Sequence, residues 1–417
     1  MGAPLVACTT RLDEDVDLLA FAGDDGVLFE SPEHGLAGRG VALQVALPTG
    51  AARAAEAADR LAEALAGVEV HDGVGRAGTG VVAFAALPFD DAVATTVTVP
   101  ATVVGRAADG TRWVTRISAG GRPAGADAGR PLVPVAGARQ AGAGPSRFTV
   151  TSSRSPEEWC AAVVEARERI RAGALTKVVL ARELVVEADR PILASDVLSR
   201  LRAAYPSAYR FSIDGFVGAS PELLVSRVGD IVRSQPMAGT AARSGDPTAD
   251  ARLAASLLAS GKDLSEHRIT IDAVLDTLLP FCSYVDAEAE PSVVAVANVQ
   301  HLATLVHGRL SSPPASALAL ATALHPTPAV GGAPRAEALA LRAEVEGLDR
   351  GRYAGPVGWV DGAGNGTFAV AVRSAQLDGC RARLYAGGGM VADSDPAAEL
   401  AETRAKFSAL LGAIVRP

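Results

Sequence analysis

The sequence predicts a mixed α/β protein of the α+β type, in which strands and helices follow one another without the regular strand–helix–strand repeat of a doubly wound fold. Apolar, β-branched runs typical of strands alternate irregularly with segments of helical periodicity. The 417 residues, 49% of them hydrophobic, can bury a large core. This length permits two or three domains or one large unit.

The N-terminal third contains predicted helix and strand. A helix is expected at residues 51–66, from its helical periodicity. Two segments with many β-branched residues, 81–88 and 94–104, predict strands.

Two stretches rich in Gly, Ala and Pro follow, at 118–130 and 136–145. Their composition predicts loops or a linker. We therefore divide the chain into an N-terminal part, residues 1–145, which contributes strands and helices, and a second region at 150–415. The glycine-rich stretch is either a boundary between these parts or a surface loop.

A helix start is marked by Ser155, Pro156 and Glu158, which supply an N-cap serine, a proline at the first helical position and a glutamate at the third. Four apolar residues on one helical face follow: Trp159, Val163, Ala166 and Ile170. Gly173 predicts the end of this helix. The apolar run at 175–186 then predicts a buried strand.

Further strands and helices are predicted in the rest of the chain. Strands at 210–213 and 216–225 are expected to pair through an Asp-Gly turn at 214–215. Later strands are expected at 367–377 and 382–386. Helices are predicted at 248–258, 265–279, 315–324, 333–346 and about 396–414.

Composition argues against several partners and locations. The net charge of −8 is spread without long blocks, which disfavours a nucleic-acid-binding surface. The four cysteines lack the spacing of a zinc site or a disulfide framework and indicate a reducing compartment. There is neither a signal-peptide pattern at the N-terminus nor an apolar run of membrane-spanning length. We expect a soluble cytoplasmic protein that binds neither nucleic acid nor a membrane.

Lys177 stands where the helix after Ser155 gives way to an apolar strand. A lysine at the mouth of a buried strand is poorly solvated and gives up its proton more readily, so it can act as a base. A surface lysine is the commoner alternative for such a residue taken alone.

The last predicted helix carries Glu399, Glu402 and Lys406, whose spacings of three and four place them on one helical face. A solvated salt-bridge ladder is the commoner role of such a trio. The glycines at 387–389, at the end of an apolar strand, let backbone N–H groups approach an anion. Glu266 is expected at the start of another helix, either as a first-turn glutamate or as a second carboxylate for Mg²⁺.

Arg373 and Glu222 complete the candidates that stand out by residue type. Arg373 lies in an otherwise apolar predicted strand, where its guanidinium either faces solvent or binds a carboxylate in bidentate fashion. Glu222 follows a proline turn and precedes a buried strand. Burial against Leu223 and Leu224 would raise its pKa and retain a proton for donation, unless the side chain is exposed at the turn.

Glu222, Glu266, Glu399, Glu402 and Lys406 belong to an ordered set of motifs. The motifs are Gly-Ala-Ser-Pro-Glu-Leu-Leu at 218–224, Pro-Met-Ala-Gly-Thr at 236–240, Lys-Asp-Leu-Ser-Glu-His at 262–267, His-Pro-Thr-Pro-Ala-Val-Gly-Gly at 325–332 and Glu-Leu-Ala-Glu-Thr-Arg-Ala-Lys at 399–406. The set resembles the chorismate-utilising enzymes over about residues 150–415. A weaker resemblance extends to Phe-Ala-Ala-Leu-Pro-Phe-Asp at 84–90. This resemblance implies extensive curved antiparallel sheets surrounded by helices, with strands from both parts of the chain.

The resemblance implies roles for the candidate residues. Lys177 and Glu222 would be the base and the acid, on opposite faces of the substrate ring. His301 would lie near the reacting hydroxyl and the enolpyruvyl ether, although a buried structural histidine is nearly as good an interpretation. The substrate-binding positions would be Gly239, Thr240, Ala329, Arg373, Gly387, Gly388, Gly389 and Lys406.

The same resemblance implies a metal site. Glu266 and Glu402 would hold Mg²⁺ against the ring carboxylate of chorismate. Glu399 would contribute directly or through water. Carboxylates from two helices suit Mg²⁺, which takes few protein oxygens and completes its shell with water and an anionic substrate.

Three positions distinguish the activities found among the chorismate-utilising enzymes. Lys177 stands where anthranilate synthases have Gln, so water rather than ammonia can be the nucleophile. Ala238 stands where aminodeoxychorismate synthases have the lysine that attacks the ring. Ala329 stands where salicylate synthases usually have threonine. The chain therefore looks most like the isochorismate synthases.

This resemblance implies the Mg²⁺-dependent, reversible conversion of chorismate to isochorismate, by water addition at C2 and loss of the C4 hydroxyl, for menaquinone or siderophore biosynthesis. Salicylate synthase, which goes on to eliminate pyruvate, stays an alternative, as does a catalytically silent binding protein. No glutamine amidotransferase subunit is needed by an enzyme that uses water, and we expect a monomer.

Overall fold

The computed structural model describes residues 4–120, 144–296 and 299–415. Within these ranges the helices are α1 (Leu18–Ala22), α2 (Ala51–Ala66), α3 (Pro156–Arg171), α4 (Ala194–Ala204), α5 (Pro247–Ala259), α6 (Gly261–Leu278), α7 (Ala317–Leu324), α8 (Arg335–Val345) and α9 (Pro396–Val415), with a 3₁₀ turn at Leu279–Phe281. None of the helices in the described part of the chain is long and apolar enough to cross a membrane.

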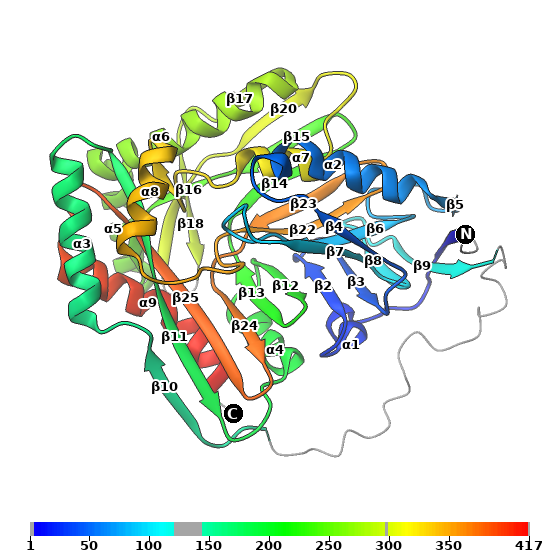
Figure 1. Ribbon diagram of the computed structural model, residues 1–417, viewed down its shortest axis with the longest axis horizontal. Coiled ribbons are helices and arrows are strands. Elements are labelled where there is room, and N and C mark those ends of the chain that lie inside the picture. The colour runs from blue at the N-terminus through cyan, green and yellow to red at the C-terminus, as the bar shows by residue number, and fades with distance from the viewer. Residues whose placement is uncertain (1–3, 121–143, 297–298, 416–417) are drawn as a thin grey trace.

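The described strands form three sheets (Figure 1). The 13-stranded sheet has the order β10 (Phe148–Ser152), β11 (Lys177–Ala188), β25 (Arg381–Met390), β24 (Ser374–Asp378), β13 (Phe216–Ser220), β12 (Tyr209–Ile213), β2 (Val27–Glu30), β3 (Gly35–Arg39), β8 (Thr102–Arg106), β9 (Arg112–Ala119), β1 (Leu5–Arg11) and β5 (Val68–Asp72), with β21 (Gly332–Ala333) paired to β11.

The 9-stranded sheet has the order β17 (Cys282–Ala287), β20 (Val306–Leu310), β15 (Ile231–Gln235), β14 (Leu223–Val228), β23 (Gly366–Val370), β22 (Pro356–Asp361), β6 (Val82–Ala86), β7 (Thr95–Val99) and β4 (Leu43–Leu47). The 3-stranded sheet has the order β16 (Met237–Ala242), β19 (Val299–Ala303) and β18 (Ser292–Val296). Among the described strands β1 and β5 pair in parallel, and the other pairs are antiparallel.

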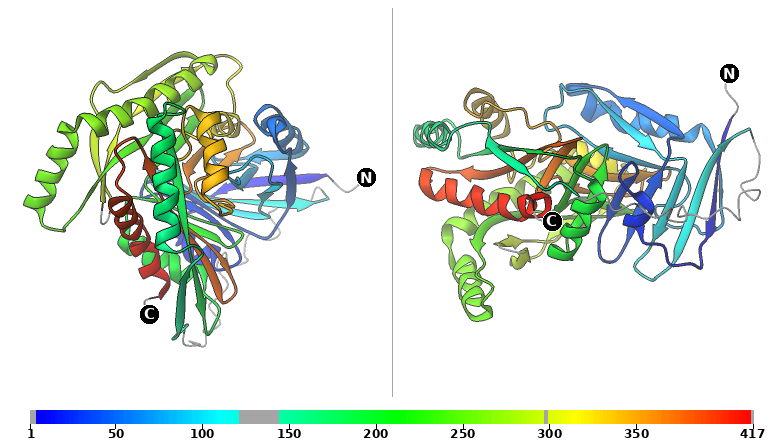
Figure 2. Two further views of the ribbon diagram at one scale, coloured as in Figure 1. Left: turned by 60° about the vertical axis from the view of Figure 1, so that its left-hand side comes forward. Right: turned by 90° about the horizontal axis from the view of Figure 1, so that it is seen from below.

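The two large sheets face each other over a buried aromatic core that includes Phe29, Phe84 and Trp113. Helices α2 and α7 cover the outer face of the 9-stranded sheet, and α1, α4 and α9 cover the 13-stranded sheet. Helices α3 and α8 pack on β11. Figure 2 shows α3, α8 and α9 grouped at one end of the molecule and the N-terminal strands at the other. The predicted antiparallel sheets with surrounding helices are confirmed.

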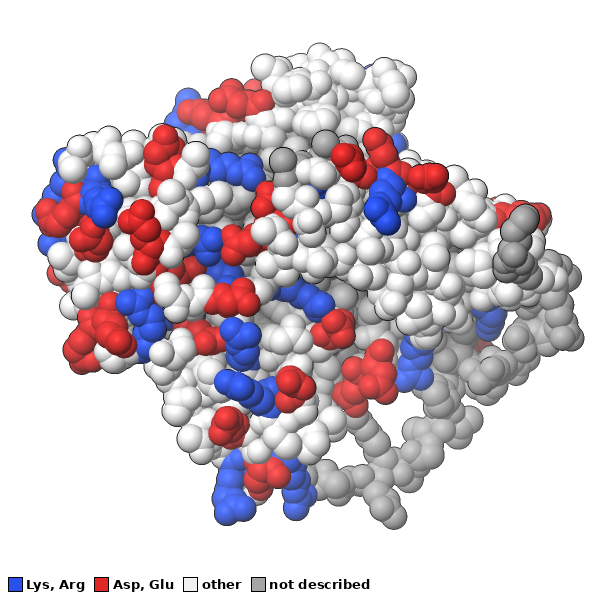
Figure 3. Space-filling model, viewed as in Figure 1, with Lys and Arg blue, Asp and Glu red and all other residues white. Residues whose placement is uncertain are grey.

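Strands from the N-terminal part complete both large sheets, because β2 pairs with β12 and β6 pairs with β22. Residues 118 and 119, predicted as loop, end strand β9 instead. Residues 144 and 145 are loop, as predicted, whereas the predicted loop residues from 121 to 143 lie outside the described ranges. On the face in Figure 3, acidic and basic side chains are interspersed.

The capping box at the start of α3 is confirmed. The Ser155 hydroxyl accepts a hydrogen bond from Glu158 N at 3.1 Å, and the Glu158 carboxylate accepts one from Ser155 N at 2.7 Å. The helix predicted at 51–66 also has these bounds, as α2. The Asp214–Gly215 turn joins β12 and β13 with φ values of 52° and 69°.

Three segments predicted as single strands are each two strands in the structure. The breaks fall at residues 100–101, 221–222 and 371–373. At each break the chain leaves one large sheet and enters the other. The predictions were wrong here because both sheets bury these residues, so the apolar pattern continues through the crossing. Pro100 and Pro221 mark two of the breaks, since proline cannot donate a ladder hydrogen bond.

Two other predicted boundaries were wrong. The glycines at 387–389 do not follow the strand but lie inside β25, with Gly387 opposite Ala181 and Gly389 opposite Val179. Helix α6 begins at Gly261, where the Ser260 hydroxyl accepts a hydrogen bond from the N–H of its third residue at 3.2 Å. Glu266 therefore lies in the second turn of α6 and not at its start.

Candidate active site

A cavity of about 330 Å³ lies between β11, β25, the first turns of α6, the start of α9 and the two crossings at residues 221–222 and 371–373. Every residue predicted at the site lines this cavity. They are Lys177, Glu222, Gly239, Thr240, Glu266, His301, Ala329, Arg373, Gly387, Gly388, Gly389, Glu399, Glu402 and Lys406.

Glu222 and Arg373 occupy two crossings that run side by side. Strand β13 pairs with β24 in one large sheet, and their continuations β14 and β23 pair in the other. Arg373 has φ = 53°, in the left-handed region, so its predicted strand conformation is wrong. The crossing turns its guanidinium into the cavity, where its Nη2 lies 3.4 Å from Nε2 of His301.

Glu222 is buried, with 6% of its surface exposed. Burial raises its pKa from the usual 4.5 to about 7, against the opposing effects of the Met237 N–H and the positive charges of Lys177 and Arg373. The Ser220 hydroxyl accepts a hydrogen bond from Glu222 N at 3.2 Å and donates one to a carbonyl of β23. The carboxyl group therefore retains a proton near neutral pH in a fixed position.

His301 is buried and neutral, because burial and the nearby charges of Arg373 and Lys406 lower its pKa to about 3. The guanidinium of Arg373 can only donate, so Nε2 of His301 accepts and the ring proton is assigned to Nδ1. Nδ1 then donates to Gly239 O at 3.2 Å, and it lies 3.1 Å from the Thr240 hydroxyl. The imidazole thus links the substrate-binding candidates Arg373 and Thr240.

Lys177 is almost fully buried, with 2% of its surface exposed, and its Nζ donates to Glu266 Oε1 at 2.6 Å. It is therefore not the surface lysine that was the commoner alternative. Space for its side chain comes from Gly389 on the neighbouring strand, where a Cβ atom would lie 2.7 Å from Lys177 Cε. The glycine and the lysine occupy adjacent strands at the floor of the cavity.

The face of α9 turned to the cavity carries the predicted trio. Lys406 Nζ pairs with Glu402 at 2.6 Å and donates to Gly387 O at 2.9 Å. Glu399 accepts a hydrogen bond from Ser394 at 2.8 Å. Partial burial and the like charge of Glu402 raise the pKa of Glu399 to about 7. The trio faces the cavity and is not a solvated ladder.

Three carboxylates are candidates for holding a metal ion. Within the described ranges no three carboxylate, imidazole or thiol side chains converge as a ready-made metal cluster. Glu266 and Glu402 are paired with lysines, while Glu399 and Glu402 repel each other. Carboxylate oxygens that repel each other in a partly buried cavity fit a small divalent cation, which also takes water and substrate oxygens.

Several cavity residues were not predicted from the sequence. Lys262 and Asp263, in the first turn of α6, belong to a motif that was recognised, but no role was assigned to them. Tyr353 and Arg350 come from the segment after α8 and are both buried. The i,i+4 spacing of Glu346 and Arg350 was a possible signal of an ion pair, but nothing in the sequence connects that pair to the cavity.

This fold and site define an enzyme that moves protons on a small, carboxylate-bearing substrate: a buried acid, a buried lysine and a neutral imidazole surround one cavity with cations at its wall. The chain belongs to the chorismate-binding enzymes, whose family model matches residues 16–415.

Known isochorismate synthases are similar to this chain over 62% of its length. The putative isochorismate synthase MenF of Mycobacterium tuberculosis is 45% identical over 274 residues, which cover 62% of this chain and 73% of that protein. Isochorismate synthase DhbC of Bacillus subtilis is 43% identical over 270 residues, covering 62% and 68%. The crystal structure of a putative 2,3-dihydroxybenzoate-specific isochorismate synthase, DhbC, from Bacillus anthracis superposes with a TM-score of 0.77 at 33% identity, covering 95% of this chain and 98% of that one.

Proposed function

We propose that this chain is an isochorismate synthase, which isomerises chorismate to isochorismate by adding water at C2 and expelling the C4 hydroxyl. One observation carries the proposal: Lys177 and Glu222, from distant parts of the sequence, line one cavity, and Glu222 retains a proton near neutral pH. Relatives at 43% and 45% identity that are named isochorismate synthases support it.

Substrate binding relies on the cations at the cavity wall. Arg373 is suited to one carboxylate of chorismate because a guanidinium binds a carboxylate through two parallel hydrogen bonds. Lys406 is suited to the other as a point charge. Gly387 and Gly388 keep space free in the cavity, since side chains there would meet the backbone of β11 and the carboxylate of Glu399. Thr240 and neutral His301 add uncharged hydrogen-bonding groups.

The proton transfers are assigned to two residues. Lys177 Nζ takes a proton from a water molecule as the water oxygen bonds to C2. The ring double bonds shift, the C4–O bond breaks, and the Glu222 carboxyl group donates its proton to the departing hydroxyl, which leaves as water. The burial that raises the pKa of Glu222 keeps it in the acid form needed for this step. Because one water enters and one leaves, substrate and product are isomers, and their similar bonding should make the reaction reversible.

We propose that Glu266 and Glu402 hold Mg²⁺, with Glu399 contributing directly or through water. Their carboxylate oxygens suit this ion, and the raised pKa of Glu399 reflects burial and a repulsion from Glu402 that a bound cation relieves. When bound, Mg²⁺ neutralises the substrate carboxylate and serves as a template.

We also propose that the enzyme works in the cytoplasm as a monomer without a glutamine amidotransferase subunit. A lysine at position 177 supports the use of water, for which no ammonia-supplying partner is needed. Size-exclusion chromatography with light scattering tests the oligomeric state. The product enters menaquinone or siderophore biosynthesis, because the menaquinone-specific isochorismate synthase MenF of Escherichia coli shares the fold and the vibriobactin-specific isochorismate synthase of Vibrio cholerae is 38% identical over 267 residues.

The test is the product profile of the purified protein with chorismate, resolved by chromatography in Mg²⁺ or in EDTA. Isochorismate alone, formed with Mg²⁺ and not with EDTA, is the expected result. Salicylate and pyruvate above a no-enzyme control would instead identify a salicylate synthase. No turnover under either condition would contradict the enzymatic proposal and favour a silent binding protein.

A further inference from the structure

On one edge of strand β11, side chains fill the gap between its two partner strands, β21 and β10. Strand β21 pairs with the first two residues of this edge and then ends. Beyond it, Arg350 Nη2 donates to Val179 O at 2.8 Å, and Glu346 Oε2 accepts from Ala181 N at 2.7 Å. These two bonds are of the kind that a neighbouring strand would make. Arg350 and Glu346 therefore replace a strand next to the segment that carries Lys177.

Arg350 and Glu346 form a bidentate ion pair. Nε of Arg350 lies 2.8 Å from Oε1 of Glu346, and Nη2 lies 2.6 Å from Oε2. Both residues are buried, with 0% and 2% of their surfaces exposed. A bidentate guanidinium–carboxylate pair fixes direction as well as distance, so it holds its backbone partners in a defined geometry.

The guanidinium also reaches the loop that leads into β21. Arg350 Nη1 donates to Val330 O at 2.9 Å. Val330 and its neighbour Ala329 both line the cavity, as does Arg350 itself. One buried side chain thus joins the strand of Lys177 to the loop of Ala329.

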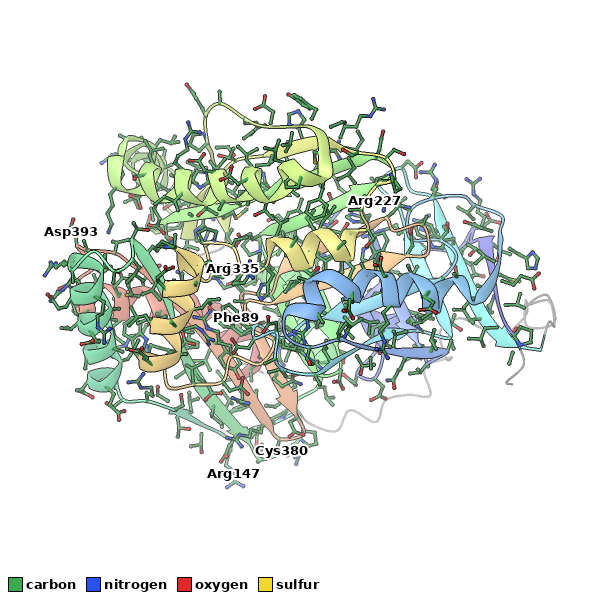
Figure 4. The ribbon with its side chains drawn as sticks, turned by 45° about the horizontal axis from the view of Figure 1, so that its top comes forward. Phe89, Arg147, Arg227, Arg335, Cys380 and Asp393 are labelled. Carbon is green, nitrogen blue, oxygen red and sulfur yellow. The ribbon has the colours of Figure 1, made fainter. Side chains whose placement is uncertain are left out.

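The N-terminal part of the chain covers this guanidinium. The ring centroid of Phe89 lies 4.2 Å from Cζ of Arg350 and 4.8 Å from Cζ of Arg342. The His325 ring meets the same ring edge-on at 5.3 Å, and its Nε2–H donates a hydrogen bond to the backbone oxygen of Phe89 at 2.9 Å. Figure 4 shows Phe89 near Arg335 in the middle of the molecule. Phe89 lies in the 84–90 motif, for which the site itself offers no other role.

We infer that Arg350 is a positioning residue, which with Glu346 and Phe89 sets Lys177 against the Ala329 loop. The inference rests on the proposed function, in which Lys177 must meet a water molecule at the ring. A misplacement of about 1 Å in such a site can lower the rate about a hundredfold. A lysine in place of Arg350 keeps the charge but cannot make the forked set of hydrogen bonds.

The variant Arg350→Lys tests the positioning role, and Arg210→Lys serves as its control. Arg210 is a matched control, since it also forms a buried ion pair, with Glu30 at 2.9 Å, and does not line the cavity. Both variants should lower the melting temperature. Arg350→Lys alone should lower kcat, by about tenfold or more, with KM within about threefold of the wild type. An unchanged kcat, or an equal fall in both variants, would overturn the inference.

A second pair of variants covers the case in which Arg350→Lys does not fold. Phe89→Leu keeps an apolar side chain but removes the cation–π contact, and Phe84→Leu is its buried control in the same motif. Phe89→Leu should lower kcat about threefold or more relative to Phe84→Leu. Equal kcat values for these two variants would contradict a role for Phe89 in positioning.

Hydrogen exchange separates failure of this inference from failure of the proposed function. Peptides covering residues 177–183 should exchange faster in Arg350→Lys than in wild type, and should be unchanged in Arg210→Lys. If the wild type does not turn over chorismate, the proposed function fails, while faster exchange still supports the positioning contact. Unchanged exchange in Arg350→Lys would refute the contact whatever the activity.

Discussion

The side-chain nitrogen Nζ of Lys177 lies 2.6 Å from Oε1 of Glu266, so the proposed base and a proposed metal ligand are hydrogen-bonded to each other. The lysine side chain is 2% exposed and the glutamate side chain 18%. Strand β11 supplies one partner and helix α6 the other. Changes at either residue therefore affect both proton transfer and the charge balance of the cavity.

Two substitutions separate the base role of Lys177 from its role as a cation. Lys177→Gln removes both the base and the cation. Lys177→Arg keeps a positive charge beside Glu266, but the arginine side chain cannot be deprotonated and so cannot act as a base. Both variants should lower kcat by at least about a hundredfold, because general base catalysis contributes on that order. The check is steady-state isochorismate formation. Activity retained in Lys177→Arg would mean that only the charge is needed. Lys177→Gln given ammonium should form an aminated product slowly.

Glu266→Gln should weaken the response to magnesium. Loss of one carboxylate ligand should raise the Mg²⁺ concentration for half-maximal rate by about tenfold or more. A titration of the rate with Mg²⁺ measures this. Asp263→Asn is the matched control, because Asp263 lies on the same helix and lines the same cavity but is not a proposed ligand. The same Mg²⁺ dependence in both variants would remove Glu266 from the metal site.

Glu222 should make the rate depend on pH. As the acid, it is active when protonated, so kcat/KM should fall as pH rises above about 7. Glu222→Gln should lower the rate by at least about a hundredfold and lose this decline. The measurement is kcat/KM as a function of pH for the wild type and for Glu222→Gln. A wild-type kcat/KM that still rises between pH 7 and 9 would exclude Glu222 as the acid.

The same carboxyl group should affect stability in a defined direction. Its folded-state pKa is raised from 4.5 to about 7, so its contribution to folding is fully present below pH 4.5 and is lost as pH rises towards and past 7. The loss corresponds to about 3 kcal/mol. Denaturant unfolding at pH 5 and pH 8 should therefore show a smaller decrease for Glu222→Gln than for the wild type. Equal decreases would contradict the raised pKa.

Gly389→Ala should lower kcat about tenfold or more, because its Cβ atom would lie 2.7 Å from Cε of Lys177 and displace the side chain. Gly412→Ala in α9 is the control, since a Cβ atom there meets no heavy atom within 4 Å. Its kcat should stay within about twofold of the wild type. If both variants keep wild-type kcat, the glycine is not needed to make room for the lysine.

Much of the local structure could be predicted because it depends on neighbours in sequence. The capping box of α3 and the bounds of α2 follow from residues a few positions apart. The residues at the site were found through motifs, residue types in local context and the family resemblance, and all of them line the cavity. The raised pKa of Glu222 was also expected from its apolar neighbours.

The geometry of the site could not be predicted. The sequence predicts that Arg373 lies in a strand, but in the structure it has φ = 53° where the chain crosses between sheets. Arg350 has no motif of its own, and its importance arises from the carbonyl oxygens of Val179 and Val330, which are distant in sequence. The glycines of β25 matter because β11 lies beside them, and strand pairing of this kind is not encoded in local periodicity.

By itself, the sequence determined the class of fold, the helices with local start signals and the kinds of side chain available for catalysis, because propensity, capping and motif spacing act over a few residues. Tertiary structure alone decided where the chain passes between the two large sheets. Both faces of such strands are buried, so the apolar pattern is the same before and after a crossing. The crossings bring Glu222 and Arg373 to one cavity with Lys177, and long-range packing thereby sets the charges and distances on which the proposed reaction depends.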